Sequence, residues 1–230
     1  MAVQFWRRTA EGVRAISPRP NLEHIRKPQI LAAAGEVISE RGIASTRIAD
    51  VAVRAGTSPP AVLYWFDDRD KLLNEALAWS EDRFYDSLTE RLAELNAPGE
   101  RLRLRFEASV ADPDWTLWME LWTHALRDAQ AQETRKRLDD RWRREIASHV
   151  RDGQATGEFD ATSDPGEVSL LLASLLDGLA LQATLGDPEV GPERLRELTF
   201  DAVERVLGAE LPELDDEPDD RGRELLAEGG

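Results

Sequence analysis

The spacing of apolar residues constrains this fold more than any other feature, because it follows a helical period along most of the chain. From Pro28 onward, apolar side chains recur three and four positions apart, and each such stretch is bounded by proline, glycine or aspartate. No segment alternates apolar and polar residues between hairpin turns, as a half-buried strand would. The sequence therefore predicts an all-α protein of about nine helices.

Three helices and the start of a fourth are expected in the N-terminal part. Proline is tolerated in the first turn of a helix, and glycine can end one in a left-handed conformation. The expected helices are Pro28 to Gly42, then Arg47 to Ala55 with Thr46 as its cap, then Ser58 to Phe66, and a long fourth helix capped by Asp67 or Asp68.

A second helical series follows the breaker at residues 96–99. Its expected members are Glu100 to Val110, Asp114 to Gln130, Thr134 to Gly153, Pro165 to Gly186 and Pro192 to Gly208. The chain is thus divided into a flexible basic arm (1–23), a DNA-binding domain (24–84), a helical ligand-binding and dimerisation domain (85–208) and a disordered acidic tail (209–230).

Two short helices joined at Gly56 match a helix-turn-helix, in which the second helix enters the major groove of DNA. The charge distribution favours this interpretation. Residues 1–54 carry 9 Lys and Arg against 5 Asp and Glu, a net +4, whereas residues 55–230 carry 20 against 40, a net −20. A cationic N-terminal segment on an acidic body orients a protein on phosphates.

DNA contacts are expected from the N-terminal turn of the second short helix and from residues near helix starts. Arg26 and Lys27 stand where the helix dipole disfavours cations unless an anion lies close, although such residues can also be solvated surface charges. Trp65 can equally close the small core. The expected contacts are Arg26, Lys27, Thr46, Arg47, Thr57, Ser58, Pro59, Pro60, Tyr64, Trp65, Arg69 and Lys71.

The segment RKPQILAAAGEVISERGIASTRIADVAVRAGTSPPAVLYWFDDRDKLL (26–73) resembles the N-terminal domain of the TetR family of repressors. Gly42, Gly56 and Phe66 stand where the family ends its first helix, makes its turn and ends its reading helix. The sequence departs from the family at Arg47, Pro60 and Leu63, which replace a hydroxyl residue, a frequent glycine and the usual tyrosine. The resemblance implies a DNA-binding homodimer and a scaffold, but not the base contacts.

Several aromatic residues of the second series share one helical face and form either a ligand pocket or a plain aromatic core. The ligand candidates are Trp115, Trp118, Met119, Trp122, Trp142, Glu120 and Gln182. Aromatic faces near carboxylates suit an organic cation. The stretches WTLWMELWTHALRD, GEFD and LLDGLALQ (115–128, 157–160 and 175–182) are also similar to the choline-sensing, BetI-like branch of the same family, which implies a cationic or amphipathic inducer.

The helix expected over residues 168–185 is apolar around much of its circumference and must be covered on two sides. With the last helix it forms either a two-fold dimer interface or the core of one chain. The residues predicted at the interface are Leu171, Leu175, Leu179, Leu195, Leu198, Ala202 and Val206.

Other functional classes find less support. The chain has no cysteine, and no catalytic or phosphate-binding motif indicates an enzyme, a cofactor or a metal site. His124 with Glu120 and Asp128 is only a weak imitation of a metal site. We therefore expect a cytoplasmic, ligand-responsive transcriptional regulator, a repressor that an inducer releases from operator DNA, with no membrane partner. The alternatives are a helical adaptor or a metal-dependent enzyme.

Overall fold

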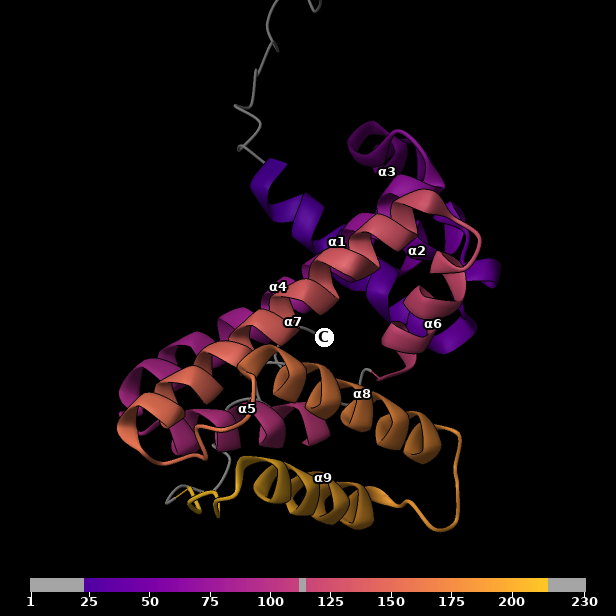
Figure 1. The fold of residues 1–230 in the computed structure, drawn as a ribbon. Coiled ribbons are helices and arrows are strands. Elements are labelled where there is room, and N and C mark those ends of the chain that lie inside the picture. Colours follow the sequence, from indigo (N-terminus) through magenta and orange to yellow (C-terminus); the bar gives the residue numbers. More distant parts are fainter. Residues whose placement is uncertain (1–22, 112–114, 215–230) are drawn as a thin grey trace, which may run out of the picture.

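The structure is a computed structural model that describes residues 23–111 and 115–214, with side chains from residue 27 onward. All of its regular structure within these ranges is helical, as the sequence predicts (Figure 1). The helices are α1 (Glu23–Arg41), the 3₁₀ turn η1 (Ile43–Ser45), α2 (Ile48–Arg54), α3 (Pro59–Phe66), α4 (Arg69–Glu94), α5 (Pro98–Ala111), α6 (Trp115–Ala125), α7 (Ala129–Thr156), α8 (Pro165–Thr184) and α9 (Pro192–Leu207).

The first three helices and the start of α4 enclose a small core of their own. Ile38, Val51 and Phe66 are fully or almost fully buried in it. Leu117 and Leu121 of α6 belong to the same core, so this helix joins the N-terminal unit to the rest of the molecule. In Figure 1, α3 lies at one end of the molecule and α8 and α9 at the other.

Local sequence explains how α2 turns into α3. Gly56 adopts a left-handed φ of 62°, and the N–H groups of Gly56 and Thr57 donate to the carbonyl oxygens of Val53 and Ala52. This pair of bonds is a Schellman motif, which ends a helix and reverses the chain direction. Ser58 then occupies the N-cap position of α3, followed by Pro59 and Pro60 in its first turn. Both features follow the sequence prediction.

A second core lies between α5, α7, α8 and α9. Phe106, Ile146, Leu172 and Val203 are almost fully inaccessible there. The GEFD segment closes one end of this core. Gly157 ends α7 in a left-handed conformation, and Phe159 packs so closely on Gly153 that a Cβ at that glycine would lie 2.1 Å from its ring. GEFD is therefore a packing motif.

Helix α8 is the one described helix long and apolar enough to cross a membrane by length and composition. It nevertheless carries Asp177 and packs against α7 and α9, which is how the core helix of a globular domain behaves.

Three expected boundaries are corrected. Helix α1 begins at Glu23, five residues before Pro28, so this proline lies inside the helix. Thr46 does not cap α2, because its hydroxyl donates to the carbonyl oxygen of Gly42 and its side chain is buried. The segment 209–214, expected to begin a disordered tail, packs on the second core through Leu211, whose N–H donates to Glu204. The arm (1–22) and residues 215–230 lie outside the described ranges.

Candidate functional sites

The face of α3 that the sequence assigns to DNA is open to solvent. Ser58, Pro59 and Pro60 are exposed at its N-terminal end, and Tyr64 has 74% of its surface exposed. Thr57 is half-buried beside them. Trp65 is half-buried against the N-terminal core, with its ring edge-on to Tyr64 at 5.6 Å between centroids. Trp65 thus lies at the edge of the small core, where it can close the core, and next to Tyr64 on the face predicted to contact DNA.

The cations expected to bind phosphate differ in how free they are. Arg47 is exposed, and no described residue forms an ion pair with it. Lys71 is held by Asp67 at 2.6 Å, which raises the pKa of the lysine, and Lys27 is held by Glu75 at 2.7 Å. The side chain of Arg26 lies outside the described residues.

Arg69 and Thr46, both expected to contact DNA, contribute to the fold of the DNA-binding unit. The guanidinium of Arg69 donates to the carbonyl oxygens of Ile43 and Thr46, on the turn between α1 and α2. Thr46 is only 1% exposed. Both residues therefore fix the turn. Thr46 is too buried to reach a groove, whereas the side chain of Arg69 is 33% exposed and its contact with phosphate stays a prediction.

Glu120 of α6 also holds the turn between α1 and α2. Its carboxylate accepts the N–H of Ile43 at 2.7 Å. Gly42, with φ 78°, leaves room for it, because a Cβ there would lie 2.9 Å from the carboxylate Oε1. The sequence placed Glu120 in the ligand pocket; the structure places it between α6 and the DNA-binding unit. No pattern in the sequence signals this pairing, because the two residues are 77 positions apart.

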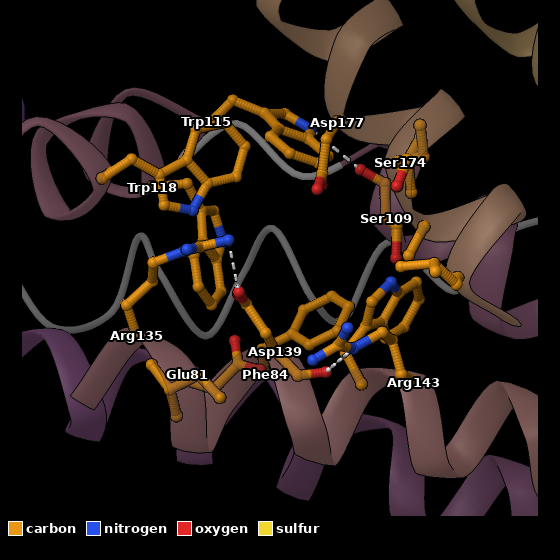
Figure 2. A pocket seen from close by; sticks show the side chains of 16 residues that line it. Glu81, Phe84, Ser109, Trp115, Trp118, Arg135, Asp139, Arg143, Ser174 and Asp177 are labelled. Carbon is orange, nitrogen blue, oxygen red and sulfur yellow. Dashed lines mark hydrogen bonds and ion pairs between the residues drawn. The ribbon is translucent and has the colours of Figure 1, made fainter. Parts of the chain in front are cut away.

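The other face of α6 lines a cavity of about 120 Å³ between α4, α5, α6, α7 and α8. Trp115, Trp118 and Trp122 come from α6, Trp142 from α7 and Phe84 from α4. Figure 2 shows Trp115 and Trp118 across the cavity from Phe84 and Asp139. The indole N–H of Trp115 donates to the carbonyl of Ser109, whereas that of Trp122 is buried without a partner among the described residues.

Charged groups complete the wall. Glu81, Asp139 and Asp177 face Arg135 and Arg143 around the cavity. Arg135 pairs with Asp139 at 2.7 Å, and Arg143 pairs with Asp140 at 2.7 Å (Figure 2 shows the first of these pairs). Burial raises the pKa of Asp139, and burial together with the nearby charge of Asp139 raises the pKa of Asp177 to about 7.

Four of the seven ligand candidates, all tryptophans, line this cavity, and three do not. Met119, Glu120 and Gln182 lie outside its wall. Other wall residues were not predicted from the sequence, among them Glu81, Phe84, Ser109, Arg135, Asp139, Arg143 and Asp177. Helical periodicity places them on particular faces, but only the packing of four other helices around α6 shows which faces meet. His124 lies 3.9 Å from Asp128, and no group of three metal-ligating residues occurs in the described ranges.

Helix α8 leaves a second apolar face uncovered. Leu171, Leu181 and Leu185 are 55%, 36% and 72% exposed, with Ser174 and Gly178 open to solvent between them. Of the residues predicted at a dimer interface, Leu171 is exposed, and Leu175, Leu179, Leu198, Ala202 and Val206 are half-buried. Leu195 is an exception, because it is buried in the core of its own chain. Each of α8 and α9 thus has one face in the core and one open.

Two family models match this chain. One, described as bacterial regulatory proteins of the tetR family, matches residues 30–76, and the other, described as a BetI-type transcriptional repressor C-terminal domain, matches residues 98–208. Together they span more than half of the chain. The first match ends inside α4, and the second begins at the first residue of α5.

Individual proteins agree with this match. The chain is 25% identical over 203 residues to a protein named HTH-type transcriptional regulator BetI from Vibrio campbellii, covering 83% of this chain and 96% of that protein. The crystal structure of a transcriptional regulator from Saccharomonospora viridis in complex with choline superposes with a TM-score of 0.73 at 28% identity, covering 79% and 96% of the two chains. A TetR-family regulator from a Rhodococcus species gives 0.71 at 29% identity, covering 79% and 98%.

Proposed function

The chain belongs to the TetR family of transcriptional regulators and carries a BetI-type C-terminal domain, and from this premise we propose that it is a cytoplasmic repressor which a small organic cation releases from operator DNA. The observation that carries the proposal is the aromatic, carboxylate-bearing cavity, which shares helix α6 with the core of the DNA-binding unit.

The DNA contacts are assigned to the exposed N-terminal end of α3. Thr57, Ser58, Pro59 and Pro60 are placed to approach base edges, with Tyr64 beside them. Arg47 is the best-placed phosphate ligand, because no described carboxylate neutralises it. Lys27 and Lys71 would first have to leave their partners, which solvent-exposed ion pairs do readily because water screens them.

Dimerisation is assigned to the open faces of α8 and α9. A two-fold symmetric dimer that binds DNA must present its two copies of α3 to successive major grooves, about 34–36 Å apart. The exposed leucines of α8, with the small residues Ser174 and Gly178 between them, supply an apolar surface for a second copy. Leu195 is removed from the expected interface residues because it is buried in its own chain, and the exposed Leu181 and Leu185 are added to them.

The ligand is assigned from the cavity. Faces of tryptophan rings attract a cation through the ring quadrupole, and desolvation strengthens that attraction. A cavity of about 150 Å³ holds benzene, so one of about 120 Å³ suits a molecule of similar size. The Saccharomonospora regulator, whose crystal structure contains choline, supports a quaternary ammonium compound. An open cleft at the α6–α7 turn shares Trp122 and Arg135 with the cavity and offers a way in.

The experiment is a mobility shift on the promoter region next to the gene, repeated at increasing salt and with choline as the probe ligand. A repressor should show a shift that weakens steeply with salt, because phosphate contacts release counterions. Choline should reverse the shift at fixed salt. Replacing Arg47 with alanine should weaken binding, whereas the same change at Arg205, which lies on α9, should not. A protein that never binds this DNA would support a helical adaptor instead.

A further inference from the structure

We propose that Asp177 is the residue by which the cavity selects a cation, and that the cation enters in exchange for a proton held on this carboxyl group. Because it concerns the same cavity, the exchange rests on the proposed function. In the step itself, the O–H bond of Asp177 breaks, the proton passes to solvent, and the ligand cation takes its place as the counter-charge.

Asp177 is set apart from the other acids of the cavity by its lack of a partner. Arg135 is occupied by Asp139 at 2.7 Å, and Arg143 donates to Asp140 and to the backbone carbonyl of Asp139. No described residue donates a hydrogen bond to Asp177 or forms an ion pair with it. Asp177 and Trp115 belong to the same cavity wall, and both are labelled in Figure 2. Arg135 and Arg143 act on Asp177 only through their charge, without forming an ion pair with it.

Neither positive charge of the wall is left to neutralise Asp177. From α4 comes Glu81, from α7 come Arg135, Asp139 and Arg143, and from α8 comes Asp177. The described lining residues from α5 and α6 are Ser109 and tryptophans, none of which carries a charge. Arg135 and Arg143 are already paired with Asp139 and Asp140, so an ionised Asp177 has no ion-pair partner among the described residues. Since an uncompensated charge is costly away from water, either a proton or a monovalent cation restores the balance.

The two ways of restoring it exclude each other. Burial, followed by the negative charge of Asp139, raises the pKa of Asp177 to about 7. Without ligand, the carboxyl group is thus largely protonated below that pH. A cation bound against the tryptophans stabilises the ionised form of Asp177 and so displaces the proton. By linkage, protonation of Asp177 weakens the binding of the cation.

The same arrangement discriminates against a zwitterion. A ligand that joins a trimethylammonium group to a carboxylate would need a free cation for its acidic end. Both guanidinium groups of the wall are already paired. Its carboxylate would instead meet Asp177 or Glu81 in a confined space, where like charges repel. The cavity should accept choline and reject its carboxylate analogue, glycine betaine.

The test is calorimetric titration of the full-length protein with choline chloride at pH 6 and pH 8.5, in pairs of buffers that differ in ionisation enthalpy. We expect binding about tenfold tighter at pH 8.5, with close to one proton released per choline at pH 6 and close to none at pH 8.5. Glycine betaine should not bind at either pH. Asp177→Asn should bind choline weakly and with no dependence on pH. Asp152→Asn, an exposed acid on α7, should behave as the wild type.

A second measurement needs no ligand. Because folding raises the pKa of Asp177, the folded chain holds a proton that the unfolded chain releases between about pH 4 and 7, so this group lowers stability as pH rises through that range. Asp177→Asn should therefore raise the melting temperature at pH 8 but not at pH 4. If Asp177→Asn and the wild type show the same melting temperatures at both pH values, the exchange is wrong. If choline binds equally well at pH 6 and pH 8.5, only the exchange is wrong. If the difference in melting temperature is present but choline never binds, the ligand class of the proposed function is wrong, and the exchange is wrong with it.

Discussion

Gly56 determines the direction in which α3 leaves α2, because only a left-handed residue can form the turn between them. Its φ is 62°, and a Cβ there would meet no atom within 4 Å, so the backbone conformation alone requires glycine. Gly35 offers the matched case. It lies inside α1 with equally open space around it, but without a left-handed φ.

We expect Gly56→Ala and Gly35→Ala to have opposite effects on the free energy of unfolding. The first should lower it by about 1–2 kcal/mol, since an L-residue is strained in the left-handed region. The second should raise it by about 0.5–1 kcal/mol, since alanine is the better helix former. Urea denaturation of both variants measures the difference. Equal effects would mean that the turn tolerates another conformation.

His149 makes the fold sensitive to acid. Its Nδ1 is buried without a partner among the described residues, and burial, followed by the positive charges of Arg105 and Arg101, lowers the pKa to about 4. Between pH 6.5 and 4 the unfolded chain therefore binds a proton that the folded chain refuses, so stability falls as pH falls through this window.

Replacing His149 with glutamine should flatten that part of the profile. Thermal unfolding at pH 7.5 and at pH 4.5 should show a smaller loss for His149→Gln than for the wild type, with the two proteins differing least at pH 7.5. An identical loss in both would show that other groups account for the sensitivity to acid.

Helix α6 contacts two different parts of the molecule, and it therefore links the proposed ligand cavity to the DNA-binding unit. Leu117 and Leu121 pack into the N-terminal core, while three tryptophans on other faces line the cavity. Glu120 adds a polar link to the turn before α2, a turn that Arg69 of α4 holds as well. Helices α4 and α6, which both hydrogen-bond to this turn, also contribute residues to the cavity wall.

Glu120→Ala should loosen this link. The N–H of Ile43 would lose its partner in a partly buried position, which costs about 1–3 kcal/mol. We expect faster amide hydrogen exchange at Ile43 and Ser45, measured by mass spectrometry or NMR. Glu120→Gln, which keeps an acceptor, should lie between alanine and the wild type, and Thr123→Ala on the exposed side of α6 should change nothing. Unchanged exchange in the alanine variant would mean that the core contacts alone hold the turn.

The molecule taken as a whole presents its reading helix at one end and an uncovered apolar face of α8 and α9 at the other (Figure 1). A face with several exposed leucines is costly in water unless a second chain covers it. We have assigned that face to a two-fold partner, which would bring two reading helices into one complex.

Leu171→Asp should convert the dimer into a monomer, because a charge would be buried at the assigned interface. Sedimentation at micromolar concentration should show half the mass of the wild type, and the affinity for promoter DNA should fall by at least tenfold. Leu126→Asp, also at an exposed leucine but at the α6–α7 turn, is the control and should remain dimeric. A dimeric Leu171→Asp variant would place the interface elsewhere.

The amino-acid sequence by itself determined the features that depend on near neighbours in the chain. Apolar spacing fixed the helices, Gly56 and Asp68 fixed a turn and a cap, and the residues around the helix-turn-helix carried the resemblance to the family. These depend on backbone conformation and helical period, which act over a few positions.

Tertiary structure alone decided which side chains meet. It placed Glu120, Arg69 and Thr46, which the sequence had assigned to binding, around one turn. It also brought Glu81, Asp139 and Asp177 from three helices to the wall of the tryptophan-lined cavity. A helical period shows which residues share a face but not which face packs against which. The pairing of faces depends on how five helices fill space together, and that is set by contacts between residues far apart in the chain.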